Sequence, residues 1–240
     1  MQATNNREQT ADTPLDVFAH LTLPQVLAMQ AERLGDRHVA LREKAYGIWQ
    51  RYTWNDYFTY VKKTALAMMA LGIKRNDIVA IIMDNHPEWL FSELGAQAFG
   101  GVSLNLFTSA VASELVQALI RVRSPLVVAQ DQEQVDKLLE QIDKLPFLRT
   151  IVYIDPTGMG PYRDNPLLMS FRELLELGEE HGRKHPGLFE QELGKGRAVE
   201  TALMIMTSGT TGVSKLAMLT HRNFTAMARQ WLDTVPLKPG

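Results

Sequence analysis

Short apolar runs alternate with amphipathic segments along most of the chain. Apolar runs without polar interruptions are typical of strands buried on both faces of a sheet. They predict strands over residues 78–83, 102–106, 126–129, 149–154 and 202–206. Between several of these runs the apolar positions repeat at helical spacing, which predicts helices over 113–121, 132–145 and 171–180. Strands that alternate with helices imply crossover connections, so the pattern favours an α/β fold with a mainly parallel sheet flanked by helices.

The N-terminal third carries turn and capping signals. Residues 38–52 alternate apolar and polar positions around a glycine turn, which predicts a β-hairpin. Thr53, followed three residues later by Asp56, predicts the capped start of a long amphipathic helix. Gly72 stands where a left-handed residue commonly ends a helix.

A second helix start and a long loop are expected farther along. Pro87 suits the first turn of a helix, and either Asp84 or Asn85 can cap it. That helix should end near Gly100. Residues 155–170 are rich in proline and glycine and predict a surface loop.

Composition and charge exclude several classes of protein. The 240 residues are 45% hydrophobic and 22% charged, as in globular domains and unlike disordered or fibrous chains. A net charge of −2 gives no support for nucleic-acid binding. The chain has no cysteine, which excludes disulfides and a cysteine nucleophile and fits a reducing compartment. Residues 1–13 are polar and predict a disordered tail, not a signal peptide. The uncharged stretch 94–113 is long enough to span a bilayer, but its polar and glycine residues favour a helix, a turn and a strand.

The candidate chemistry lies after the strand predicted at 202–206. Thr207 to Lys215 reads Thr-Ser-Gly-Thr-Thr-Gly-Val-Ser-Lys. Small residues leave backbone N–H groups uncovered, and consecutive N–H groups in a turn form a nest that binds anions. Hydroxyl groups and the Lys215 ammonium add donors and positive charge, which suits a polyphosphate. The position fits as well, since ligands bind beyond the carboxyl ends of parallel strands.

This loop is not a Walker A motif, which needs four residues between its glycines and a helix after its lysine. Only two residues separate Gly209 from Gly212, and the apolar run Leu216 to Leu219 predicts a strand after Lys215. The alternative interpretation is a Ser/Thr/Gly-rich hairpin loop without a ligand.

The loop resembles the signature of the adenylate-forming (AMP-binding) superfamily. That signature runs Thr-Ser-Gly-Thr-Thr-Gly-x-Pro-Lys-Gly and continues with Thr/Ser-His-x-Asn, which Thr220 to Asn223 match. Ser214 and Leu216 depart from it, standing where proline and glycine are usual. Neither change removes a phosphate donor.

Upstream segments resemble bacterial long-chain acyl-CoA synthetases. The resemblance covers residues 14–233, and its segments are 42–50, 84–89, 131–139 and 155–158. It implies that residues 14–240 are the N-terminal part of an AMP-binding domain. The family's downstream motifs are absent from these 240 residues, so we expect the chain alone not to make acyl-CoA.

The resemblance also implies a reaction, cofactors and roles for residues. A long-chain fatty acid would be activated by ATP to acyl-AMP and then transferred to coenzyme A. Cofactor-binding roles would fall on Thr207, Ser208, Gly209, Thr210, Thr211, Gly212 and Lys215. Lys215 would be catalytic, and the Thr207 hydroxyl would help to hold Mg²⁺.

Two other functions stay open at this point. The chain could belong to an adenylating enzyme for another carboxylate or acceptor, or be a non-catalytic nucleotide- or lipid-binding module. The expected partners are fatty acid, ATP and CoA, with no nucleic acid. The expected location is the cytoplasm, with peripheral membrane contact open.

Three histidines are weaker candidates. His181 and His185 are four residues apart, a spacing that on a helix can hold zinc. Gly182 between them and Pro186 after them favour a solvated loop instead. His221 follows a predicted helix cap at Thr220, which favours a packing or capping role over one in shaping a ligand pocket.

Overall fold

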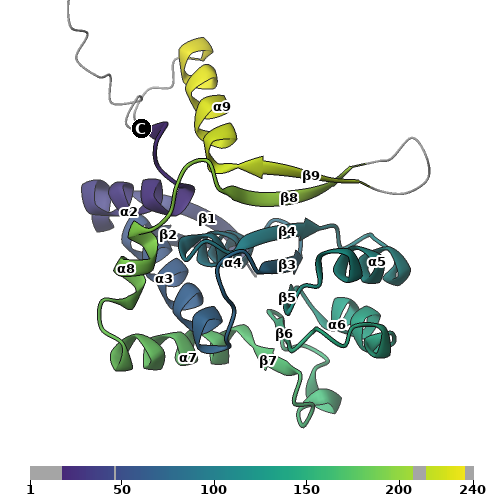
Figure 1. The fold of residues 1–240 in the computed structure, drawn as a ribbon. Coiled ribbons are helices and arrows are strands. Elements are labelled where there is room, and N and C mark those ends of the chain that lie inside the picture. Colours follow the sequence, from purple (N-terminus) through teal and green to yellow (C-terminus); the bar gives the residue numbers. More distant parts are fainter. Residues whose placement is uncertain (1–17, 46, 208–214, 236–240) are drawn as a thin grey trace, which may run out of the picture.

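The computed structural model describes residues 18–45, 47–207 and 215–235 (Figure 1). The predicted tail at residues 1–13 lies outside these ranges. The α-helices are α2 (Leu23–Leu34), α3 (Trp54–Ala70), α4 (Pro87–Ala98), α5 (Ala112–Val122), α6 (Gln132–Leu139), α7 (Phe171–Lys184), α8 (Leu188–Gly194) and α9 (His221–Thr234). The strands are β1 (Val39–Ala45), β2 (Ile48–Thr53), β3 (Ile78–Ile82), β4 (Val102–Leu106), β5 (Leu126–Ala129), β6 (Thr150–Tyr153), β7 (Leu168–Ser170), β8 (Thr201–Thr207) and β9 (Lys215–Thr220). Short 3₁₀ turns are η1 (Gly35–Arg37), η2 (Ile142–Lys144) and η3 (Gly160–Tyr162).

A seven-stranded sheet forms the centre of the molecule, in the order β7-β6-β5-β3-β4-β8-β9. Every neighbouring pair is parallel except β8 and β9, which are antiparallel. The predicted α/β class with a mainly parallel sheet flanked by helices is therefore confirmed.

Helices cover both faces of this sheet, as Figure 1 shows. Successive residues of β3 point to opposite faces. Val79 and Ile81 join the core beneath α2, α3, α4, α7 and α8, whereas Ala80 and Ile82 join the core beneath α5 and α6. Burial on both sides explains why β3 is apolar throughout and does not alternate.

The first long helix begins as its sequence predicts. The Thr53 hydroxyl accepts from the Asp56 N–H at 3.0 Å, and the Asp56 carboxylate accepts from the Thr53 N–H at 2.8 Å. This capping box satisfies two backbone groups that would otherwise lack partners. Gly72, just past the end of α3, has a φ of 76°, a conformation in which a β-carbon would be strained.

The predicted cap of α4 is wrong. The N-cap is His86, which makes no side-chain cap bond, and neither Asp84 nor Asn85 holds that position. Pro87 is the first residue of the helix, as expected. The N-cap is therefore the residue just before it, one position after Asn85. Asp84 instead accepts from the Thr108 hydroxyl at 2.9 Å, across the end of the sheet.

Two other boundaries differ from the expected ones. The helix expected over 132–145 ends at Leu139, and η2 follows, which lets Leu145 turn back into the core at 1% exposure. The loop expected over 155–170 contains β7, whose three residues pair with β6 at the edge of the sheet. A strand so short carries too little periodicity to be seen in sequence.

The helix expected over 171–180 continues through Gly182 to Lys184. The polar connection that follows contains another helix, α8, anchored by the buried Phe189. Glycines are tolerated in α7 because this helix packs very closely on α3. A β-carbon at Gly178 would lie 1.9 Å from the Lys63 carbonyl oxygen.

The uncharged stretch 94–113 divides as expected into the end of α4, a glycine turn, β4 and the start of α5. Among the described residues, none of the helices combines the length and the apolar character needed to cross a membrane.

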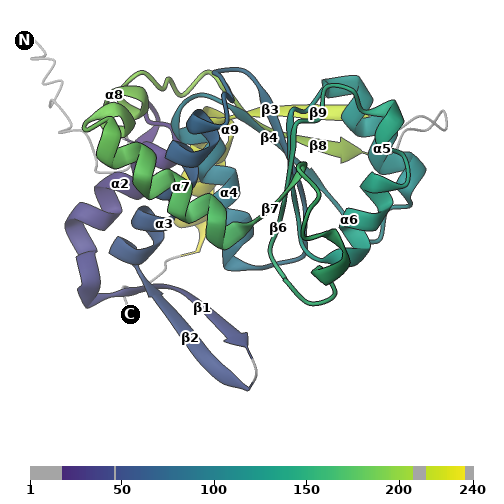
Figure 2. The ribbon, with the colours of Figure 1, turned by 90° about the horizontal axis from the view of Figure 1, so that it is seen from below.

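The hairpin predicted over 38–52 is β1 paired with β2, and it forms a separate two-stranded sheet. It projects from the body of the molecule beside α2 and α3, as Figure 2 shows. The Tyr52 ring of β2 packs edge-on against Phe91 of α4, and Glu43 forms a polar contact with His86 at the start of α4, considered below.

Candidate functional site

The carboxyl ends of β3, β4 and β8 meet at one edge of the sheet, where a pocket of about 650 Å³ opens. Parallel strands commonly place their ligands at this edge. Its walls are largely apolar, with a few polar groups. The lining residues are Ile81, Met83, Asp84, Asn85, Trp89, Asn105, Leu106, Phe107 and Ile205.

A buried polar network lies behind this pocket. The Asn105 amide donates to Glu93 at 2.8 Å, and the Gln97 amide donates to the other Glu93 oxygen at 3.4 Å. Burial raises the pKa of Glu93, and these two donors oppose that shift. Among the described residues, no group donates to the buried side-chain oxygen of Asn105, so a donor on a bound ligand could satisfy it.

The ends of the predicted phosphate loop are held together beside the pocket. Thr207 ends β8 and Lys215 begins β9, and the two residues are cross-strand partners. The Thr207 hydroxyl donates to the Lys215 carbonyl at 3.3 Å. The pocket wall at Ile205 is two residues before Thr207. Five of the predicted phosphate-binding residues lie outside the described residues, namely Ser208, Gly209, Thr210, Thr211 and Gly212.

Lys215 is exposed at the start of β9. Within the described part of the chain its ammonium forms no ion pair. A charge that no described carboxylate neutralises is available to an anionic ligand. The prediction that Lys215 binds phosphate is therefore compatible with the structure and stays a prediction.

Leu216 follows Lys215 and packs as a strand residue. It pairs with Met206 and lies against the core beneath α5 and α6. We expect Leu216→Gly to lower stability by about 1 kcal/mol or more, because glycine loses this packing and restricts the unfolded chain less. Chemical unfolding of the two proteins measures the difference. If Leu216→Gly instead stabilised the protein or raised its activity, the leucine at this position would be a functional defect, because glycine is usual there in the family signature.

Thr220 and His221 begin α9 and have structural roles. Thr220 caps the helix in a capping box with Asn223, as the sequence predicts. His221 is 2% exposed, and its Nδ1 accepts from the Leu23 N–H at 3.2 Å, which ties α9 to α2. Burial lowers the pKa of His221 to about 4. The ring does not line the pocket at the sheet edge.

The buried His221 should make stability depend on pH. The unfolded chain takes up this proton near pH 6.5 and the folded chain near pH 4, so stability falls as the pH drops through that interval. The loss should reach about 2 kcal/mol at pH 5. His221→Gln keeps an acceptor but does not titrate. The free energy of unfolding of each protein is therefore measured as a function of pH, and the difference between the two proteins is the contribution of His221. If the free energies of unfolding of the two proteins changed equally between pH 6.5 and 5, a buried neutral imidazole at His221 would be excluded.

His181 and His185 come together more closely than the sequence predicts. Because α7 continues through Gly182, their ring centres lie 4.4 Å apart. The prediction that the two histidines lie in a solvated loop is wrong at His181, which is helical, whereas His185 is the C-cap residue of α7. No third ligand joins the pair among the described residues.

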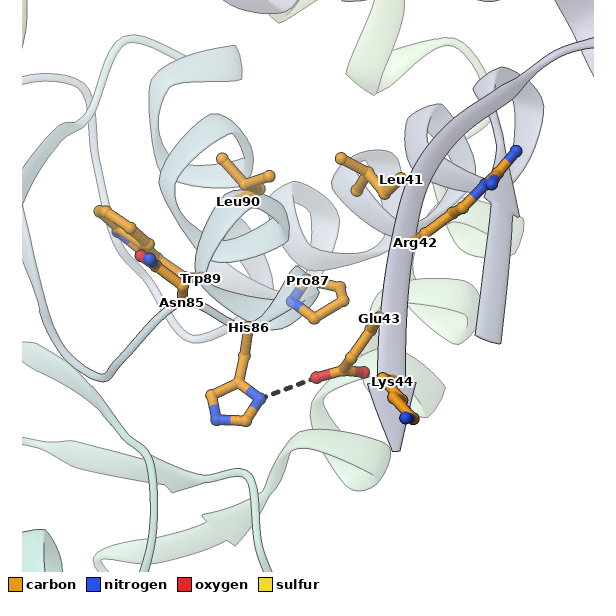
Figure 3. Close-up of a pocket in the computed structure, with 9 residues that line it drawn as sticks. All are labelled: Leu41, Arg42, Glu43, Lys44, Asn85, His86, Pro87, Trp89 and Leu90. Atoms are coloured by element: carbon orange, nitrogen blue, oxygen red, sulfur yellow. Dashed lines mark hydrogen bonds and ion pairs between the residues drawn. The ribbon is translucent and has the colours of Figure 1, made fainter. Parts of the chain in front are cut away.

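A different group of potential ligands was not found from sequence. Atoms of Glu43, His86 and Glu88 lie within 4.8 Å of one another. Glu43 Oε1 lies 2.9 Å from His86 Nδ1, and Figure 3 shows the carboxylate reaching from β1 to the His86 ring. A cation would sit at the positive end of the α4 dipole there, which is unfavourable. We therefore interpret the pair as a link between the hairpin and α4. No local sequence signal joins residues 43 positions apart.

The pocket residues were also missed, although one signal could have found them. Asp84, Asn85, Asn105 and Phe107 all stand at or just after the ends of predicted buried strands. Applying the strand-end rule to every strand, and not only to the one before the glycine-rich loop, would have placed them at one edge.

Comparison with known proteins places this geometry in a family. The family model described as AMP-binding enzyme matches residues 27–239. The long-chain-fatty-acid–CoA ligase ACSBG1 of Bos taurus is 28% identical over 218 residues, which cover 91% of this chain and 29% of that protein. The ligase ACSBG2 of Xenopus laevis is 27% identical over 232 residues, which cover 95% of this chain and 30% of that protein. The chain thus spans about 30% of the length of the curated relatives it matches.

Solved structures share the fold. The anthranilate CoA ligase AuaEII in complex with anthranoyl-AMP aligns with a TM-score of 0.73 at 20% identity, covering 92% of this chain and 38% of that one. The Mycobacterium tuberculosis fatty acyl CoA synthetase aligns with a TM-score of 0.69 at 19% identity, and the alignment covers 90% of this chain and 38% of that one. Since the family model covers most of the sequence and the sheet carries the glycine-rich loop at its carboxyl edge, the chain belongs to the AMP-binding enzyme family.

Proposed function

We propose that residues 14–240 form the N-terminal part of the AMP-binding domain of a long-chain-fatty-acid–CoA ligase. The observation that carries the proposal is the position of the glycine-rich loop, which joins β8 to β9 at the carboxyl edge of a mainly parallel sheet. The names of the relatives, all long-chain-fatty-acid–CoA ligases, support the choice of substrate. The absence of cysteine favours a reducing compartment such as the cytoplasm.

The proposed reaction has two halves. A fatty-acid carboxylate oxygen attacks the α-phosphorus of ATP, and the bond to the bridging oxygen breaks to release pyrophosphate. The coenzyme A thiolate then attacks the acyl carbonyl carbon, and AMP leaves with the bonding electron pair. The first half concentrates negative charge on the leaving phosphates, where preorganised N–H groups and cations are most effective.

Residues of this chain would supply that stabilisation. The backbone and hydroxyls of residues 207–212 would donate to the β- and γ-phosphates, and the Lys215 ammonium would neutralise their charge. The cross-strand contact between Thr207 and Lys215 favours this arrangement, because it fixes the two ends of the loop on one side of the sheet.

The Thr207 hydroxyl fits a role in holding Mg²⁺. Its proton is directed to the Lys215 carbonyl, which leaves oxygen lone pairs free, and Mg²⁺ prefers oxygen ligands. Bound Mg²⁺ would neutralise charge on the phosphates. The apolar pocket beside the loop is our candidate for part of the acyl site, with Phe107 and Ile205 in its wall.

A series of fatty acids tests the proposed substrate in the complete enzyme that contains this chain. Each buried CH₂ group contributes about 0.8 kcal/mol, or about fourfold, so kcat/KM should rise from short to long acids. Coupled release of pyrophosphate measures it. A preference for acetate or for an aromatic acid would contradict the long-chain assignment, and ATP binding without turnover would favour a non-catalytic module.

A further inference from the structure

The β1–β2 hairpin has two chemically different faces. In an antiparallel pair, residues directly opposite each other share a face. Arg42 pairs with Arg51 and Lys44 pairs with Trp49, so these four side chains lie together on one face, here called the basic face. All four are exposed, and Trp49 has 59% of its surface accessible.

The opposite face of the hairpin is directed to the body of the protein. It carries Leu41 and Tyr52, which are half-buried against the core, and Glu43, which bonds to His86. Figure 3 shows Glu43 directed to α4 while Arg42 extends away from it. The hairpin's only carboxylate is therefore turned away from its three cations.

The cations of the basic face have no partners within the described residues. Neither arginine nor Lys44 forms an ion pair there. The hairpin carries three cations against one carboxylate in a chain whose net charge is −2. Positive charge is thus concentrated on one projecting surface, beside an exposed tryptophan.

We propose that the basic face docks on the surface of an anionic lipid bilayer. Arginine and lysine are attracted to acidic headgroups, and tryptophan prefers the interface between headgroups and acyl chains. The face lies on an element that projects from the body, as Figure 2 shows, so it can meet an extended surface. Binding is peripheral and electrostatic, and it does not depend on the proposed ligase activity.

Sedimentation with lipid vesicles tests the proposal on the 240-residue chain. The chain should bind vesicles of phosphatidylcholine mixed with phosphatidylglycerol, bind phosphatidylcholine alone much more weakly, and dissociate as salt is added. Each cation near an anionic surface contributes about fivefold to partitioning, so the triple variant Arg42→Gln, Lys44→Gln, Arg51→Gln should partition about 100-fold less.

A second triple variant controls for net charge. It is Lys144→Gln, Arg163→Gln, Lys184→Gln, which removes three exposed cations outside the hairpin. It should bind nearly as the unaltered chain does. Equal losses in the two triple variants, or undiminished binding by the hairpin variant, would overturn the proposal. Arg42→Lys with Arg51→Lys keeps the charge and should keep binding, which separates loss of charge from loss of the hairpin's structure.

Tryptophan provides an independent readout. Trp49 and Trp231 are similarly exposed, at 59% and 62%, but only Trp49 lies on the basic face. Trp49→Ala should weaken binding and abolish the blue shift of fluorescence on anionic vesicles, whereas Trp231→Ala should do neither. Binding of duplex DNA with the same dependence on Arg42, Lys44 and Arg51 would assign the face to nucleic acid and refute a lipid surface.

Discussion

Lys215→Ala should slow adenylation by about 10² to 10³, or about 3–4 kcal/mol of transition-state stabilisation. The ammonium is the only cation among residues 206–216, so no neighbour in the chain readily replaces it. Negative charge on the phosphates grows as pyrophosphate leaves, which is when a fixed cation is most effective. Exchange of labelled pyrophosphate into ATP by the complete enzyme measures this step.

Stability separates this role from a structural one. Lys215 is exposed and begins an edge strand, so its removal should change the unfolding free energy little. Lys215→Arg should recover part of the exchange rate, because it restores charge with a different shape. Lys195→Ala removes another exposed lysine and should exchange normally. Normal exchange by Lys215→Ala would refute the phosphate role, and a collapse in stability would make Lys215 structural.

The alternation of elements could be predicted because each buried strand and each cap leaves a local signal. β3 lies between two layers of helices, so all its residues are apolar, and Thr53 caps α3 through a residue only three positions away. Sheet order has no such signal. β5 lies beside β3, and β4 lies on the other side, because of crossovers whose geometry is set by the packed helices.

Contacts between distant residues account for most of what sequence did not predict. Asp84 does not cap α4 and instead accepts from Thr108, 24 residues later, a contact that no local pattern indicates. Helix α7 does not stop at Gly182, because packing on α3 outweighs the weak helix propensity of glycine. The pocket at the sheet edge combines ends of three strands, and its walls could be assembled only once their order was known.

The second large effect is expected from a substitution at Gly178, where α7 packs closely on α3. Gly178→Ala should destabilise the protein by about 3 kcal/mol or more, at the upper end of what overpacking costs. The added methyl group would lie 1.9 Å from the Lys63 carbonyl oxygen, and backbone cannot move aside as a side chain can. The two helices must separate, which loosens the contacts of the fully buried Leu174. The midpoint of urea unfolding measures the loss.

Two other glycines in helices provide matched controls. Within the described ranges, a methyl group at Gly182 would meet only the end of the Leu66 side chain, at 2.9 Å, which can rotate away, so Gly182→Ala should cost less. At Gly194, the last residue of α8, no described atom lies within 4 Å of an added methyl group, and Gly194→Ala should stabilise by up to about 0.5–1 kcal/mol through helix propensity alone. The order of stability should therefore be Gly194→Ala above Gly182→Ala above Gly178→Ala. If Gly178→Ala were as stable as Gly182→Ala, α7 would not be held against α3 as closely as the structure shows, and the long helix through Gly182 would lose its explanation.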